Sequence, residues 1–326
     1  MADSSPVDPR VFVVGCPRSG TTLLQRILDA HADLAVANDT HFVTRSVEKL
    51  GLSAQALAGD AIPLTDEVLA GVREYHRFPR LGLDEAAVER AAARASTYAS
   101  FVGALYEELA IAKGKRFGGE KTPDFVRRLP LLHALFPATR TVHIIRDGRD
   151  VILSLLQWAT PTKGPGRLAT WADEPLGTAA LWWEWQVQSG RKARAKVGDD
   201  RCMELRYEAL ASEPEPEAHR LCAFLGLDYD PRMLAFHEGR RRDDPTLDAK
   251  KAWLPPTPGL RNWREQMDED GLALVETLIG PFLEELGYER SIDAVPGEIS
   301  ARAEACRVAF SQALEERGQS KTEESR

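Results

Sequence analysis

The sequence predicts an α/β protein: a P-loop-type parallel β-sheet flanked by helices, with a helical insertion after the second strand. Two stretches support this class, because each is an apolar run followed directly by a loop and a helix. Residues 11–14 (VFVV) precede a glycine-bracketed loop, and residues 141–145 (TVHII) precede the segment RDGRD. Apolar runs rich in β-branched residues are typical of strands buried on both faces of a parallel sheet. Alanine-rich helical stretches between residues 43 and 116 account for the insertion.

Length and composition are those of an ordinary globular protein. We expect residues 1–10 to be a flexible N-terminus, and residues 11–290 to form one α/β domain that includes the helical insertion 43–116. Residues 291–326 are expected to form a C-terminal helix and a frayed tail. The net charge of −8 argues against a broad nucleic-acid-binding surface. A homo-oligomer is left open.

The N-terminus and the cysteines predict a cytoplasmic protein. The first ten residues are polar, and no apolar run reaches the length of a membrane span. The cysteines are scattered without the spacing of a metal site, so we expect reduced thiols and no bound metal. The four are Cys16, Cys202, Cys222 and Cys306.

The loop after the first predicted strand has the layout of a phosphate-binding loop. Residues 15–22 read GCPRSGTT, and apolar residues at helical spacing follow. The amides of such a loop and of the first helical turn converge on an anion at the positive end of the helix dipole. The nucleoside-triphosphate loop GxxxxGK[ST] has a lysine where Thr21 stands, and here the cation is Arg18. Because an ATPase or GTPase needs that lysine on the distal phosphates, the sequence favours a ligand with a different distal group.

A second candidate strand, residues 34–36 (LAV), is followed by Asp39 and His41. Ligands of open α/β sheets bind at the carboxyl ends of the strands, where these two side chains could take a proton from a substrate. The alternative is that Asp39 or Thr40 caps the next helix. The residues alone leave the two interpretations about even.

The region before the third apolar run is predicted to be helix, loop and helix. Helices are expected over residues 65–77 and 84–113, and residues 118–123 (GGEKTP) are expected to be a loop before a helix at 124–135. A lysine in such a loop, Lys121, could project into the ligand crevice. The alternative is a surface lysine beside a turn.

The second strand–loop–helix stretch also carries groups that bind phosphate. Arg146 ends the strand and Ser154 lies eight residues further on, so a guanidinium and a hydroxyl could meet one phosphate there. Residues 159–177, rich in glycine, proline and threonine, predict a mobile loop that could act as a gate. Further along the chain we expect helices over 178–197, 214–225, 268–286 and 298–316, a strand over 202–206, and a turn beginning at Tyr207.

Several segments resemble, in the same order, the sulfotransferases that use 3′-phosphoadenosine 5′-phosphosulfate (PAPS). PRSGTTLL and RDGRDVILSLL are the most specific, and AHADLAVANDTHF, GEKTPDF and RNWREQM add support. The similar branch is that of the tyrosylprotein sulfotransferases and their bacterial small-molecule relatives. The resemblance covers about residues 10–290.

The resemblance implies how PAPS is bound. Arg146 and Ser154 would hold the 3′-phosphate, and Tyr207 and Arg261 would help to hold the nucleotide. The loop would hold the 5′-phosphate and the sulfate, through Arg18, Ser19, Gly20, Thr21 and Thr22.

The resemblance also implies the catalytic groups. Asp39 stands where the relatives carry a catalytic glutamate, and because its side chain is shorter, His41 is kept as the alternative base. Lys121 falls where the relatives place a transition-state lysine. The expected reaction moves a sulfuryl group in line from PAPS to a hydroxyl or amine of a small-molecule acceptor, without a metal. Fixed cations such as Arg18 and Lys121 would stabilise the charge.

Two other functions stay open from the residues alone. One is a P-loop kinase of a small metabolite, against which the missing loop lysine argues. The other is a non-catalytic nucleotide-binding protein that keeps the fold. The identity of the acceptor cannot be read from the sequence.

Overall fold

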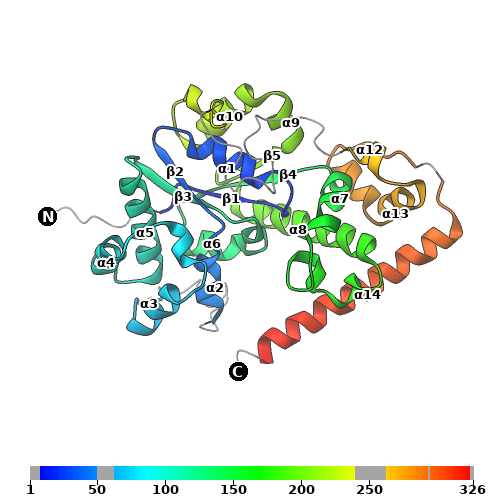
Figure 1. Ribbon diagram of the computed structural model, residues 1–326, viewed down its shortest axis with the longest axis horizontal. Coiled ribbons are helices and arrows are strands. Elements are labelled where there is room, and N and C mark those ends of the chain that lie inside the picture. Colours follow the sequence, from blue (N-terminus) through cyan, green and yellow to red (C-terminus); the bar gives the residue numbers. More distant parts are fainter. Residues whose placement is uncertain (1–7, 50–61, 239–261, 293, 324–326) are drawn as a thin grey trace. The chain divides into compact units, whose positions relative to one another are not determined.

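The computed structural model describes residues 8–49, 62–238, 262–292 and 294–323 (Figure 1). The chain forms two compact units, each assembled from several stretches. It passes from one unit to the other inside the glycine-bracketed loop and at the end of the strand before RDGRD. The first unit comprises residues 1–15, 20–144 and 190–258, and the second comprises residues 16–19, 145–189 and 259–326.

The first unit is organised around a five-stranded sheet with the strand order β2-β3-β1-β4-β5. Pairing is parallel between β2 and β3, between β3 and β1, and between β1 and β4. The predicted α/β class is therefore confirmed, and β3 lies between β2 and β1. The strands are β1 (Val11–Val14), β2 (Leu34–Asn38), β3 (Phe117–Lys121), β4 (Arg140–Ile145) and β5 (Cys202–Arg206).

The central strand β1 contributes apolar side chains to both faces of the sheet. Phe12 and Val14 belong to a core that includes residues of α5 (Tyr98–Ala112) and α6 (Leu129–Leu135). Val11 and Val13 belong to another core, with residues of α1 (Thr21–Asp29) and α10 (Pro214–Leu225). Since both faces are covered, all of the strand is apolar, as the sequence indicated.

The helical insertion between β2 and β3 is confirmed, but it has more elements than predicted. The single helix predicted over residues 84–113 is wrong, because a capping box starts a new helix after Thr97. The Thr97 hydroxyl accepts from the Ser100 amide at 3.1 Å, and the Ser100 hydroxyl accepts from the Thr97 amide at 3.0 Å. The elements are α2 (Phe42–Lys49), α3 (Asp66–Arg73), the 3₁₀ helix η2 (Phe78–Leu81), α4 (Glu85–Ala93) and α5.

The loop predicted over residues 118–123 is wrong, because most of that stretch is strand β3. Gly118 and Gly119 suggested a turn, yet here glycine is needed for close packing of strands. A Cβ on Gly119 would lie 2.6 Å from the carbonyl oxygen of Val11. The helix predicted next begins as the 3₁₀ helix η3 (Pro123–Arg128) and continues as α6.

The second unit is mostly helical. The helices predicted over 178–197, 268–286 and 298–316 are confirmed, and the stretch 159–177 contains two short 3₁₀ helices. In the first unit, Tyr207 begins helix α9 (Tyr207–Ser212), where a turn was predicted. No helix in the described part of the chain is long and apolar enough to cross a membrane. The helices of the second unit are α7 (Gly148–Trp158), η4 (Gly164–Arg167), η5 (Ala169–Trp171), the first part of α8 (Pro175–Val197), α12 (Trp263–Gln266), α13 (Glu269–Glu285) and α14 (Gly297–Glu323).

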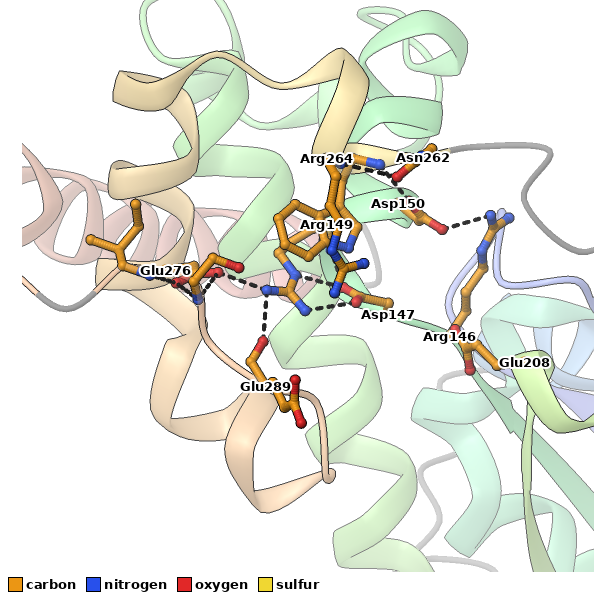
Figure 2. A network of polar contacts seen from close by, with 12 residues as sticks. Arg146, Asp147, Arg149, Asp150, Glu208, Asn262, Arg264, Glu276 and Glu289 are labelled. Atoms are coloured by element: carbon orange, nitrogen blue, oxygen red, sulfur yellow. Dashed lines mark hydrogen bonds and ion pairs between the residues drawn. The ribbon is translucent and has the colours of Figure 1, made fainter.

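A buried ionic network joins the helices of the second unit (Figure 2). Arg149 Nη1 donates to Glu276 Oε1 at 2.6 Å and to the Glu289 carbonyl oxygen at 2.9 Å. Arg149 Nη2 donates to Asp147 Oδ2 at 2.8 Å. Arg149 and Glu276 are both buried, so each charge needs compensation, which Arg149 receives from Glu276 and Asp147 together. The network ties α7 to α13 and to the segment that follows it.

Candidate active site

The residues implicated by the sequence fall into two groups, one in each compact unit. Arg261 lies outside the described residues. In the described part of the chain none of the four cysteines forms a disulfide, and no group of acidic, histidine or cysteine side chains is placed to hold a metal ion. The first unit holds Gly20, Thr21, Thr22, Asp39, His41, Lys121 and Tyr207, and the second holds Arg18, Ser19, Arg146 and Ser154.

Asp39 lies just after β2, in a loop of uncommon backbone geometry. The φ angles of Asp39 and His41 are 63° and 62°, in the left-handed region that residues other than glycine seldom adopt. Asp39 Oδ1 lies 3.1 Å from His41 Nε2. Asp39 Oδ2 accepts from Arg77 Nη1 at 3.4 Å and from Arg80 Nη1 at 3.3 Å. The carboxylate therefore contacts three basic side chains, and the helix-capping alternative for Asp39 is wrong.

The surroundings of Asp39 favour its ionised form. Burial raises the pKa of this carboxyl, but the hydrogen bond with His41 and the positive charges of Lys121 and Arg77 outweigh burial and hold the pKa well below its usual range. Asp39 is therefore a carboxylate at neutral pH and can accept a proton. The same cations weaken it as a base, because a low pKa reduces the driving force for proton transfer.

Lys121 ends β3, directly beside the end of β2. It is the register partner of Asn38, and its carbonyl oxygen accepts from the Asp39 amide at 2.7 Å. Lys121 is only 1% exposed, so the alternative of a surface lysine is wrong. The pairing of β2 with β3 thus brings Lys121 to the loop that carries Asp39 and His41.

Glu120, the neighbour of Lys121 in the strand, is a buried residue that the sequence reasoning missed. Its carboxylate accepts from the Thr40 hydroxyl at 2.6 Å, and also from the hydroxyls of Thr122 and Tyr106. A strand prediction for this segment would have indicated it, because one glutamate inside a buried strand needs polar partners on its face of the sheet.

A small polar cavity lies beside His41. Within it Arg127 Nη2 and Asp124 Oδ1 are 3.4 Å apart. Burial raises the pKa of Asp124, but the charges of Arg127, His41 and Arg45 outweigh burial and lower it. Positive charge therefore prevails around the Asp39–His41 pair. The cavity is lined by His41, Thr44, Arg45, Asp124, Arg127 and Arg128.

The second unit holds the other part of the phosphate-binding loop. Arg18 has a φ of 80°, and its Nε donates to the Ser154 hydroxyl at 2.8 Å. The Ser19 hydroxyl is buried and has no hydrogen-bond partner among the described residues. A buried polar atom without a partner is costly, and a ligand is one way to satisfy it. The chemistry of this loop thus fits an oxyanion such as a phosphate or sulfate.

Arg146 directly follows β4 and is nearly buried. Its Nη2 donates to Asp150 Oδ2 at 2.9 Å, and Asp150 Oδ1 accepts from the Trp263 amide at 3.0 Å (Figure 2). Burial raises the pKa of Asp150, although Arg146 acts in the opposite direction. Ser154 contacts Arg18, so the shared phosphate expected for Arg146 and Ser154 stays a prediction.

Gly20 and Tyr207 contact each other in the first unit. Gly20 is the N-cap of α1 with a φ of 93°, and a Cβ at this position would collide with the ring of Tyr207. Only glycine combines this conformation with so close an approach. Helix α1 begins at Thr21, directly after Gly20, and no side chain caps it.

Comparison with known proteins gives one family. A profile of the sulfotransferase family matches residues 9–231. A Caenorhabditis briggsae protein described as a candidate protein-tyrosine sulfotransferase is 29% identical over 289 residues, which cover 86% of this chain and 89% of the relative. Nodulation protein NoeE of Sinorhizobium fredii is 28% identical over 322 residues, which cover 89% of this chain and 68% of that protein. The solved sulfotransferase domain of the Synechococcus olefin synthase has a similar fold, with a TM-score of 0.59 at 22% identity over 88% of this chain and 97% of that domain.

Proposed function

The chain belongs to the sulfotransferase family, and from this premise we propose which of its residues carry the reaction. The reaction is the transfer of a sulfuryl group from PAPS to an acceptor. Like phosphoryl transfer, it passes through a loose transition state with charge on the peripheral oxygens. The protein therefore contributes mainly positioning and fixed positive charge. The family match favours neither the kinase nor the non-catalytic alternative.

In our proposal, the loop of residues 15–22 binds the phosphosulfate end of PAPS. The buried Ser19 hydroxyl supports this assignment because it lacks a partner among the described residues. The amides at the start of α1, which follows its N-cap Gly20, add the positive end of the helix dipole. Arg146 and Ser154 would bind the 3′-phosphate, with Tyr207 and Arg261 holding the rest of the nucleotide.

Asp39 is the proposed base. The acceptor oxygen attacks the sulfur, the bond from sulfur to the 5′-phosphate oxygen breaks, and the acceptor proton passes to Asp39. The observation that carries this assignment is a carboxylate just after β2, 3.1 Å from His41 Nε2. The positive charge of Lys121 lowers its pKa and keeps it ionised. Arg18 and Lys121 would stabilise the charge on the transferring group and on the leaving phosphate. His41 is the alternative base.

The acceptor in this proposal is a small molecule with a hydroxyl or amine and a negatively charged group. The basic side chains around the Asp39–His41 pair support the negative group. Arg77 and Arg80 contact the carboxylate itself, and Arg45 and Arg127 line the cavity beside His41. A matched pair of acceptors, one with a carboxylate and one with its methyl ester, tests this: we expect the carboxylate to have the lower KM.

A screen of PAPS against a library of hydroxyl and amine compounds, read by product mass, tests the function. We expect one acceptor class to gain the mass of one SO₃ group, in proportion to the PAP released. If no acceptor is sulfated while PAP binds tightly, the protein is a nucleotide-binding protein. If ATP and Mg²⁺ instead phosphorylate an acceptor, it is a kinase.

The 3′-phosphate assignment can be tested without a known acceptor. Arg146→Ala should weaken binding of PAPS by tenfold or more, because a charge-assisted hydrogen bond to the phosphate is lost. Binding of adenosine 5′-phosphosulfate, which lacks the 3′-phosphate, should change much less. Calorimetric titration of both nucleotides measures the difference, with Ser154→Ala as the milder matched variant. Equal losses for the two nucleotides would remove Arg146 from this role.

A further inference from the structure

We propose that Glu120 is a positioning residue, which holds the loop carrying Asp39 and His41 in its strained conformation. The proposal rests on the proposed function, because it matters for catalysis only if one of these two side chains takes the acceptor proton.

The contacts of Glu120 converge on the loop. Its Oε1 accepts from the Thr40 amide at 3.0 Å, from the Thr40 hydroxyl at 2.6 Å and from the His41 amide at 3.3 Å. The Thr122 hydroxyl donates to the same oxygen. Three donors of the loop thus share one acceptor atom, which is supplied by the neighbouring strand.

The other carboxylate oxygen is held from the opposite side. The Tyr106 hydroxyl, on α5, donates to Glu120 Oε2. Burial raises the pKa of Tyr106 far above its ordinary value, and the negative charge of Glu120 adds to this, so Tyr106 keeps its proton and stays a donor. Both oxygens of the Glu120 carboxylate are therefore hydrogen-bonded. The side chain is held in one position, so it can hold the loop in one conformation.

The loop needs such support because its backbone is strained. Thr40 lies between two residues, Asp39 and His41, that both adopt the left-handed conformation. Residues with a side chain seldom keep this conformation unless their surroundings impose it. A second contact comes from the backbone of β3, where the Lys121 carbonyl oxygen accepts from the Asp39 amide at 2.7 Å. The end of β3 thus holds the loop through one side chain and one backbone group.

A carboxylate suits this task better than other side chains. Glu120 is fully buried, and its five donors are neutral, being three hydroxyls and two amides. An ionised carboxylate accepts at both oxygens and donates at neither. A glutamine would keep one accepting oxygen and turn an NH₂ group toward Tyr106, whose hydroxyl can rotate to accept. A leucine would leave every donor without an acceptor.

Hydrogen exchange of the Thr40 and His41 amides tests the anchoring in the full chain without any acceptor. We expect exchange at least tenfold faster in Glu120→Leu and intermediate in Glu120→Gln. Tyr106→Phe, the matched control, removes a donor on the side away from the loop and should stay close to wild type. If Glu120→Leu does not fold, Thr40→Val and Glu120→Gln carry the same test. Unchanged exchange in both would overturn the anchoring.

Kinetics with the first acceptor identified in the screen test the link to catalysis. We expect Glu120→Gln and Thr40→Val to lower kcat, toward the 10²-fold loss that a misplacement of about 1 Å can cause, with the KM for PAPS unchanged. In an Asp39→Asn background the same changes should have no further effect, which a general loss of folding would not reproduce. Undiminished kcat in both variants would overturn the proposal. Full activity of Asp39→Asn alone would instead remove the proposed base and leave the exchange result standing.

Discussion

Two fully buried glutamates, one in each unit, are stabilised in different ways. Glu276 accepts from the guanidinium of Arg149 at 2.6 Å and from the Ser291 amide at 2.9 Å (Figure 2). In the described part of the chain, Glu120 accepts from neutral hydroxyls and amides, three of which belong to the loop of Asp39 and His41. The first arrangement joins helices and touches none of the predicted site residues. The second holds a loop. Both glutamates are equally buried, so it is the hydrogen-bond partners of each carboxylate that indicate its role.

Breaking the Arg149–Glu276 pair should have the largest effect on stability. Glu276→Ala leaves the buried guanidinium of Arg149 with Asp147 as its only remaining carboxylate among the described residues, and we expect the free energy of unfolding to fall by about 3–5 kcal/mol in denaturant titration. The double variant Arg149→Met/Glu276→Leu should recover part of that loss, because the Arg149–Glu276 pair is then replaced by apolar side chains, although Asp147 loses its contact with Arg149. A cost below about 1 kcal/mol for Glu276→Ala would show that this ion pair does not join the helices.

Lowering the pH should destabilise the unit that holds Glu120, because all seven histidines lie in it. Burial lowers the pKa of His143 to about 3, and burial with the charge of Arg201 lowers that of His133 to about 4. In the unfolded chain both titrate near 6.5. Below that pH the unfolded state binds protons that the folded state does not, so stability falls as the pH is lowered from about 6.5 toward 4.

The variant His143→Leu measures this effect. Each buried histidine contributes about 1.4 kcal/mol per pH unit in that window, so the variant should lose about that much less stability per unit than wild type. Unfolding titrations at pH 5.5 and 4.5, where the unfolded histidine is almost fully protonated and the folded one is not, provide the comparison. The same slope in both proteins would show that His143 can be protonated in the folded state.

The smallest effect is expected for an exposed ion pair in the second unit. Arg302 Nε lies 2.7 Å from Glu174 Oε2, nearly the same separation as in the buried pair, but the Arg302 side chain is 44% exposed. Arg302→Ala should lower the free energy of unfolding by about 0.2–1 kcal/mol, and less at high salt. Because geometry is similar and burial is not, a loss as large as that of Glu276→Ala would contradict the importance given to burial.

The fold was predictable where one-dimensional patterns carry the signal. The unbroken apolar run VFVV indicated β1, the run TVHII indicated β4, and alanine-rich amphipathic stretches indicated the insertion. Strand β3 was not predictable from local pattern, because Gly118 and Gly119 are required by close packing against distant residues. The break between α4 and α5 was missed for a similar reason. The capping box of Thr97 and Ser100 forms only where the chain starts a new helix, and the sequence pattern did not indicate that start.

The site residues were likewise predictable only where a local sequence pattern indicated them. Asp39, His41 and Lys121 were indicated by their positions after predicted strands or in a motif, and the structure brings the three together. Glu120 was missed because its strand was missed. The contact of Arg18 with Ser154 joins positions 136 residues apart, which no local pattern encodes. The roles of these residues stay predictions that kinetics must test.

The most direct test of the proposed base compares Asp39→Asn with His41→Gln at saturating PAPS and acceptor. We expect Asp39→Asn to lower kcat by about 10²–10⁴-fold while PAP binds as in wild type, and His41→Gln to lower kcat by less than about tenfold. Because the pKa of Asp39 lies below its usual range, the wild-type rate should show no acidic limb where histidines titrate. Near-normal turnover by Asp39→Asn, together with loss of turnover in His41→Gln, would contradict the assignment of Asp39 as the base.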